Sequence, residues 1–156
     1  MSAISLVNQA VLWYAASGVL AFIFTLRKPL SGAIARIGGA VASAMLIVAA
    51  IATLITPEQV SDGMLQMLSL PARVNGINAL WLLAIGLSAL PVALFNIAWH
   101  RHSQVKANGL LVNLLLASAT CAVVATNFGT LVVMAEMMAL CGAFLTGCAQ
   151  SAKLWV

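Results

Sequence analysis

Glu136 is the residue whose chemistry differs most from that of its surroundings. No other charged residue lies between Lys106 and Lys153, and residues 131–140 around it are otherwise apolar. A carboxylate at the centre of a membrane helix costs roughly 2.5–3.5 kcal/mol on insertion-based scales. An ionisable group at that depth is by default one that holds or moves a proton, so Glu136 is the candidate proton relay. The alternative is a carboxyl group that stays protonated and acts as a structural hydrogen-bond donor.

Two hydroxyl residues are candidate neighbours of this carboxyl group. Residues 126–130 have the composition of a tight turn, so the apolar runs on either side are expected to form an antiparallel helical pair. Reflecting position 136 about Asn127 gives position 118, which places Ser118 and Thr120 near Glu136 in depth. The spacing does not set the rotation of either helix about its axis. A hydrogen bond from either hydroxyl to Glu136 is therefore a geometric option only.

His100 and His102 form a second candidate site, on either side of Arg101 and directly after Trp99. Histidine titrates near physiological pH, so this pair is a candidate for collecting protons at the inner mouth of a channel. We favour the simpler alternative, a loop anchored at the membrane interface by aromatic and basic residues. Two histidines with no acid nearby do not make a metal site.

The cysteines suggest neither metal nor redox chemistry. All three lie in apolar runs and none forms a CxxC pair; they are Cys121, Cys141 and Cys148. Small apolar packing residues are the favoured interpretation. We predict no catalytic residue, no metal and no cofactor in this chain.

The composition indicates an integral membrane protein. The chain has 156 residues, of which 63% are hydrophobic and 6% are charged, whereas a soluble domain carries about 25% charged residues. So few charges could not cover a surface that faces water. The net charge of +4 does not suggest nucleic-acid binding, because the basic residues flank apolar runs and form no patch with interleaved aromatics.

Five apolar segments are long enough to cross a bilayer, which needs about 20 residues. They are residues 4–26, 34–56, 77–99, 109–126 and 128–148. The predicted fold is therefore a single all-α membrane domain with five transmembrane helices.

Basic residues set the predicted orientation. Six of them share one side of the membrane in this arrangement: Arg27, Lys28, Arg36, Arg101, Lys106 and Lys153. Arg73 alone lies on the other side. Positive charge accumulates on the cytoplasmic side of membrane proteins, so the N-terminus is predicted to lie outside.

The outer loop, residues 57–76, differs from the rest of the chain. It holds two prolines, Pro57 and Pro71, and both of the other acidic residues, Glu58 and Asp62. Residues 64–70 alternate only loosely between apolar and polar types. A short strand or hairpin on the outer surface and an ordinary exposed loop are both compatible with this pattern.

Two long stretches resemble a known family. They are FNIAWHRHSQVKANG at residues 95–109 and VVMAEMMAL at residues 132–140, and the start MSAISL is similar as well. The chain resembles the N-terminal part of the formate hydrogenlyase subunit 3 family, which are membrane subunits of bacterial nickel–iron hydrogenase complexes. The hydrogenase-4 membrane subunit is a more distant match.

The resemblance implies membership of the antiporter-like family shared with respiratory complex I and the Mrp antiporters. In that family a glutamate on the fifth helix belongs to a proton pathway, and it corresponds to Glu136 here. The family also has an outside N-terminus and a hairpin-rich outer loop after helix two. Family members are several times longer, and the lysine that faces this glutamate lies on a later, broken helix. This chain is thus expected to be the N-terminal piece of a longer subunit.

The apolar segments predict a multi-pass membrane protein in contact with lipid, and the resemblance implies the bacterial inner membrane and other subunits of a hydrogenase and formate dehydrogenase complex as partners. The chain would anchor the soluble arm of that complex and couple electron transfer to proton movement. The alternatives are a cation/proton antiporter of the Mrp type, a complex I antiporter-like subunit, and a small membrane assembly scaffold without transport.

Overall fold

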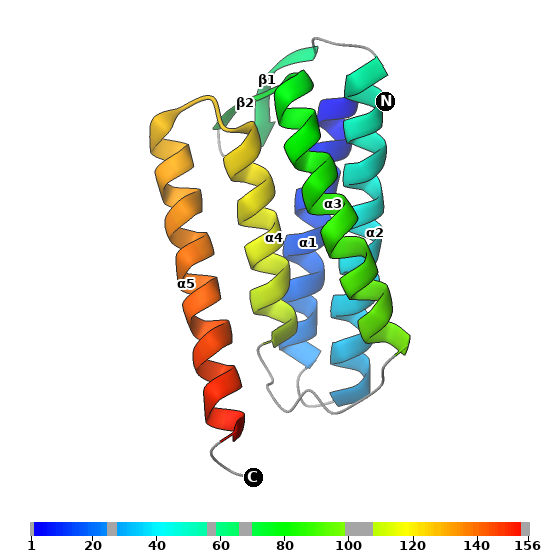
Figure 1. The fold of residues 1–156 in the computed structure, drawn as a ribbon, viewed down its shortest axis with the longest axis vertical. Helices are drawn as coiled ribbons and strands as arrows, with labels where there is room; N and C mark the ends of the chain where they lie inside the picture. The colour runs from blue at the N-terminus through cyan, green and yellow to red at the C-terminus, as the bar shows by residue number, and fades with distance from the viewer. Residues whose placement is uncertain (1, 25–27, 56–58, 66–69, 99–107, 154–156) are drawn as a thin grey trace.

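The computed structural model describes residues 2–24, 28–55, 59–65, 70–98 and 108–153, which form five helices and one β-hairpin (Figure 1). In chain order the elements are α1 (Ala3–Ile23), α2 (Lys28–Ile55), β1 (Gln59–Leu65), β2 (Leu70–Val74), α3 (Gly76–Ala98), α4 (Asn108–Val124) and α5 (Phe128–Lys153). The helices run side by side and alternate in direction, with the hairpin and the α4–α5 turn at one end of the bundle (Figure 1).

The predicted all-α membrane fold is confirmed. Among the described residues, four helices are long and apolar enough to cross a membrane: Ala3–Ile23, Ser31–Ile55, Gly76–Phe95 and Phe128–Gly147. The apolar helix α4 has 17 residues, which is the lower end of the usual range for a membrane helix. Large hydrophobic side chains face outward, among them Ile55, Ile77 and Trp81, and a lipid-facing surface has this character.

Two helices extend beyond the apolar segments that predicted them. α2 begins at Lys28 rather than at residue 34, and α5 continues to Lys153 rather than ending at 148. Pro29 is compatible with the early start, because a helix tolerates proline in its first turn, where the backbone N–H has no helical partner. Hydropathy measures the apolar part of a helix and misses polar turns at its ends.

Small residues let α1 and α2 pack closely. The side chains buried by α1 recur every three or four residues, which is one face of a helix; they include Ala3, Val7, Ala10, Tyr14, Ser17 and Ala21. On α2, Gly38 lies directly against Ser17, and a Cβ atom at Gly38 would overlap the Ser17 side chain. Close approach of this kind allows strong van der Waals contact between membrane helices.

A buried hydrogen bond joins the same two helices. The Tyr14 hydroxyl lies 2.8 Å from Ser43 Oγ, and both residues are fully buried. Ser43 Oγ donates its single proton to Gly39 O at 2.7 Å. Tyr14 must therefore be the donor to Ser43, so that both hydroxyl protons are bonded in a region without water.

The outer loop contains a β-hairpin, so the first of the two options for this segment is the one the chain adopts. β1 and β2 pair antiparallel, with Gln59 opposite Val74 and Leu65 opposite Leu70. The pairing is irregular between Ser61 and Leu65. The loose alternation in the sequence is consistent with this irregular register.

The hairpin is attached to the bundle through β2. Ala72 and Val74 are buried and Arg73 between them is exposed, as expected for a strand with one face on a core. Ala72 also forms an isolated antiparallel bridge with Ala125, just after α4. The end of α4 next to the hairpin is therefore held by the hairpin as well as by the neighbouring helices.

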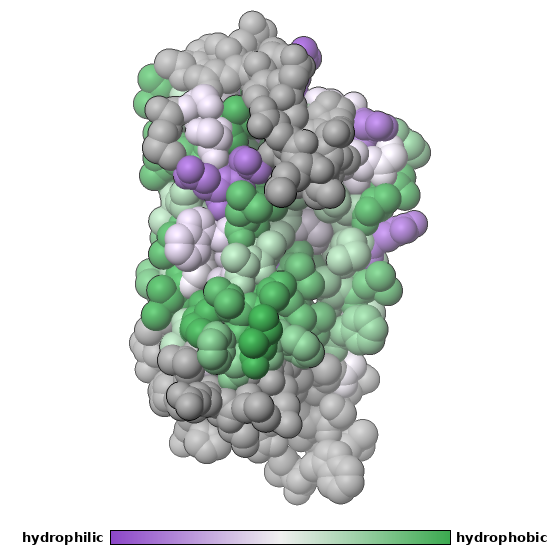
Figure 2. Space-filling view, turned by 180° about the vertical axis from the view of Figure 1, so that it is seen from behind, coloured by the Kyte–Doolittle hydropathy of each residue, from purple (hydrophilic) through white to green (hydrophobic). Residues whose placement is uncertain are grey.

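α5 lies at the edge of the bundle with α4 as its principal neighbour (Figure 1). Only 6% of the membrane-spanning stretch of α5 is buried inside the bundle, against 44% of the corresponding stretch of α2. Seen from behind, hydrophobic residues cover much of the middle of the molecule (Figure 2). The helix that carries the candidate proton relay is thus the least enclosed of the four long apolar helices.

Candidate proton-relay site on α5

Asn127 starts the helix that carries Glu136. Its side-chain Oδ1 accepts the backbone N–H of Gly129 at 3.0 Å, and its carbonyl accepts the N–H of Leu131 at 3.1 Å. This is helix capping, which satisfies donors that have no partner inside the helix. From Phe128 to Glu136 the helix rises about 12 Å. Glu136 therefore lies well inside the membrane-spanning part of α5, since a hydrocarbon core is about 30 Å thick.

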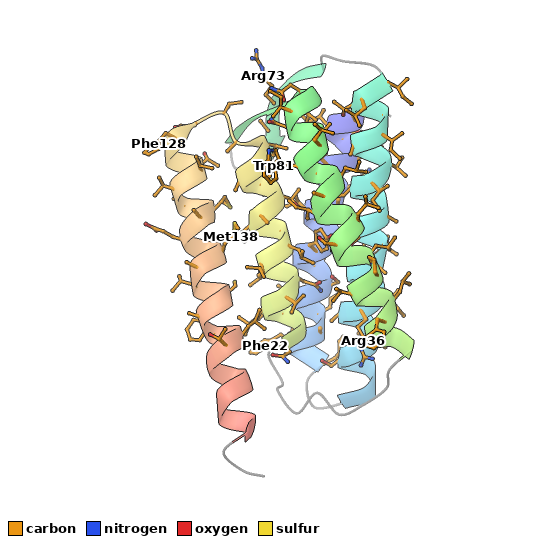
Figure 3. The ribbon with its side chains drawn as sticks, in the orientation of Figure 1. Phe22, Arg36, Arg73, Trp81, Phe128 and Met138 are labelled. Carbon is orange, nitrogen blue, oxygen red and sulfur yellow. The ribbon has the colours of Figure 1, made fainter. Side chains whose placement is uncertain are left out.

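The side of α5 that faces α4 is marked by three residues at helical spacing. Met134 packs against the buried core, Met138 is half-buried on the side toward α4 (Figure 3), and Cys141 is buried. Successive residues are about 100° apart around a helix, so Glu136 lies about 200° from both Met134 and Met138. The carboxyl group is accordingly on the side of α5 opposite α4.

Glu136 is exposed, and so are apolar residues on its face of the helix. Val133, Leu140 and Phe144 have exposed fractions of 51%, 54% and 60%. Among the described residues, the side chain of Glu136 has no hydrogen-bonding or ionic partner. We define the outward face of α5 as Val133, Glu136, Leu140 and Phe144. It is a hydrophobic surface with a single acid near its middle.

The structure does not bring the two candidate hydroxyls to this carboxyl group. Ser118 and Thr120 are buried within the bundle. Ser118 Oγ lies 2.8 Å from Leu114 O, and Thr120 Oγ1 donates to Leu116 O at 2.8 Å. Each hydroxyl is thus bonded to the preceding turn of α4. Both lie on the buried side of the α4–α5 pair, whereas Glu136 lies on its exposed side.

His100 and His102 lie outside the described residues. The basic side chains Arg36 and Arg73 lie at opposite ends of the bundle, and neither is near the middle of α5 (Figure 3). Among the described residues there is no group of three or more His, Cys, Asp or Glu side chains that could hold a metal ion.

One buried polar residue was not singled out from the sequence. Asn113 on α4 is 3% exposed and bonds to both α1 and α2. A polar amide within a predicted membrane span is a signal that could have found it, because such groups are stable only where other helices bond to them.

No protein-family model matches the chain. A search of curated proteins finds a 52% identity over 155 residues with "Formate hydrogenlyase subunit 3" of Escherichia coli (strain K12). The match covers 99% of this chain and 25% of that protein, so the chain spans about a quarter of the length of the relative it matches. Similarity at this level together with the apolar helices shows a multi-pass inner-membrane protein. Almost the whole of this chain is therefore similar to one quarter of "Formate hydrogenlyase subunit 3".

Proposed function

We propose that this chain forms part of the membrane subunit of a formate hydrogenlyase-type complex. In such a complex, formate oxidation supplies the electrons that reduce protons to hydrogen in the soluble arm. The chain itself contributes membrane helices that anchor this arm. The observation that carries the proposal is the 52% identity along almost the whole chain, which is too extensive to reflect the membrane setting alone.

Within that subunit we assign Glu136 as a relay for protons. In general an apolar environment favours the neutral form of a carboxyl group, and a nearby cation favours the carboxylate. A carboxyl group for which these two effects are balanced can take up a proton and release it again. Because Glu136 is exposed on the outward face of α5, it is oriented toward a neighbour that lies beyond the five described helices.

The proposed neighbour is a further membrane helix with a basic side chain opposite Glu136. Leaving the acid against lipid would cost roughly 2.5–3.5 kcal/mol, and the apolar residues around it would fit the surface of another helix. The approach of a basic partner would stabilise the carboxylate and release the proton, and its movement away or neutralisation would let Glu136 take up a proton again. The outward face of α5 supports this assignment because it is hydrophobic except for the acid.

A chimeric subunit tests the proposed function. The matching quarter of the Escherichia coli relative would be replaced by this chain, and hydrogen would be measured by gas chromatography after formate is added to the cells. We expect the chimera to restore hydrogen evolution to a strain that lacks the native subunit. A chimera present in the membrane at the native level but without hydrogen evolution would contradict the proposal. In that case the antiporter and scaffold alternatives would gain support.

A further inference from the structure

The amide of Asn113 joins three helices. Its Nδ2 group donates to Ser17 Oγ on α1 at 3.1 Å and to the backbone oxygen of Ala35 on α2, also at 3.1 Å. Ser17 and Asn113 are each 3% exposed. Both protons of one amide group are thus bonded across helix interfaces, in a region without water to replace either bond.

The backbone around this amide is packed closely enough to hold it in one place. A Cβ atom at Gly39 would lie 3.0 Å from Asn113 Oδ1, and one at Gly18 would lie 3.3 Å from Asn113 Cβ. Both distances are shorter than ordinary contacts. The two glycines therefore leave room for this side chain and for little else, which restricts α4 to one position against α1 and α2.

The hydrogen bonds of this junction end on backbone carbonyls. Asn113 donates to Ser17, whose hydroxyl donates in turn to Tyr14 O at 3.2 Å, and the second amide proton goes to Ala35 O. A carbonyl oxygen cannot pass a proton on to a further group. The arrangement is that of a fixed connection between helices and not of a proton path.

We propose that Asn113 is the anchor that holds the α4–α5 hairpin on the bundle. α5 has α4 as its principal neighbour, so the placement of α5 depends on how α4 is attached. Near its beginning α4 is bonded by Asn113, and at its other end Ala72 bridges to Ala125. Without the amide, α4 and α5 separate together from α1 and α2 more often, while remaining paired with each other. This proposal does not depend on whether Glu136 carries protons.

Two native cysteines provide the test. Cys121 on α4 belongs to the core cluster formed with α1 and α2, and Cys141 is buried on α5. In the 156-residue chain with Cys148→Ser, purified in detergent, the rate of alkylation by N-ethylmaleimide would be followed at each thiol by mass spectrometry. For Asn113→Leu we expect roughly a tenfold faster reaction at Cys121, from the loss of two interhelical bonds. The rate at Cys141 should stay the same.

If Asn113→Leu does not fold, variants that disturb only part of the Asn113 site can be used in its place. Ser17→Ala removes one of the two hydrogen-bond acceptors of the amide. Gly39→Ala places a Cβ atom 3.0 Å from Asn113 Oδ1 and so displaces the amide. Each variant should increase the rate of alkylation at Cys121 by a smaller factor than Asn113→Leu. Gly86→Ala is the matched control, because its Cβ would meet Ile47 Cγ1 at 2.7 Å in the α2–α3 interface, and it should leave Cys121 unchanged. The proposal is overturned if the amide variants label Cys121 at the wild-type rate, or if Cys121 and Cys141 accelerate together.

Discussion

Glu136→Gln in the chimeric subunit is expected to reduce formate-driven proton movement across the membrane by more than tenfold. Glutamine has nearly the same size and can form hydrogen bonds, but it cannot take up and release a proton at any relevant pH. The outward face of α5 keeps its shape in this variant, so assembly should be unaffected. Proton movement would be followed with a pH-sensitive dye in sealed membrane vesicles after formate is added.

Two controls separate loss of the acid from loss of structure. Glu136→Asp keeps a carboxyl group and should retain a measurable part of the proton movement. Gly142→Ala changes a position on the same helix that has no atom within 4 Å of the added Cβ, and it should behave like the wild type. Wild-type proton movement in Glu136→Gln vesicles, at an equal amount of assembled complex, would remove Glu136 from the proton path.

Gly38→Ala is expected to lower the stability of the chain by about 3 kcal/mol, at the upper end of overpacking effects. The added Cβ would overlap the Ser17 side chain, so α1 and α2 would have to move apart along their whole contact. For a chain of this size the midpoint of thermal unfolding should fall by roughly 6–12 °C. Circular dichroism of the purified chain in detergent measures this shift.

Two further variants test whether the clash with the Ser17 side chain causes the loss of stability in Gly38→Ala. Gly142→Ala makes the same chemical change within a helix but has open space around it, so it should not lower the midpoint. In Ser17→Gly/Gly38→Ala the overlapping side chain is absent, and the nearest remaining atom is Ser17 Cα at 3.6 Å, an ordinary contact. The double variant should be more stable than Gly38→Ala alone. If Gly38→Ala and Gly142→Ala have equal midpoints, α1 and α2 do not pack as described.

The helices could be predicted from sequence because the membrane imposes a strong and simple constraint. A spanning segment must be apolar over about 20 residues, so the runs that contain Tyr14, Leu46, Leu82 and Glu136 identify four helices with little ambiguity. The turn before α5 was also predictable, since Asn127 and Gly129 are typical turn residues. The hairpin remained one of two options because its strands are short and their pairing is irregular.

The environment of Glu136 was harder to predict because it depends on helix rotation. The spacing about Asn127 relates depths along two helices, and it correctly suggested an antiparallel pair. Which side of each helix faces the other depends on packing with a third helix. Ser118 and Thr120 turn inward with the buried side of α4, whereas Glu136 turns outward opposite Met134. Asn113 was missed for the same reason, since its partners lie on two helices distant in sequence.

In the assembled complex, the outward face of α5, with Glu136 near its middle, is expected to contact protein and not lipid. A photo-reactive amino acid at position 140 tests it most directly, because Leu140 lies one turn beyond Glu136 on that face and is 54% exposed. The residue would be incorporated in the chimeric subunit, the assembled complex irradiated in its native membrane, and the adducts identified by mass spectrometry. We predict cross-links to a peptide from another membrane helix of the complex. Adducts to lipid alone would contradict the claim.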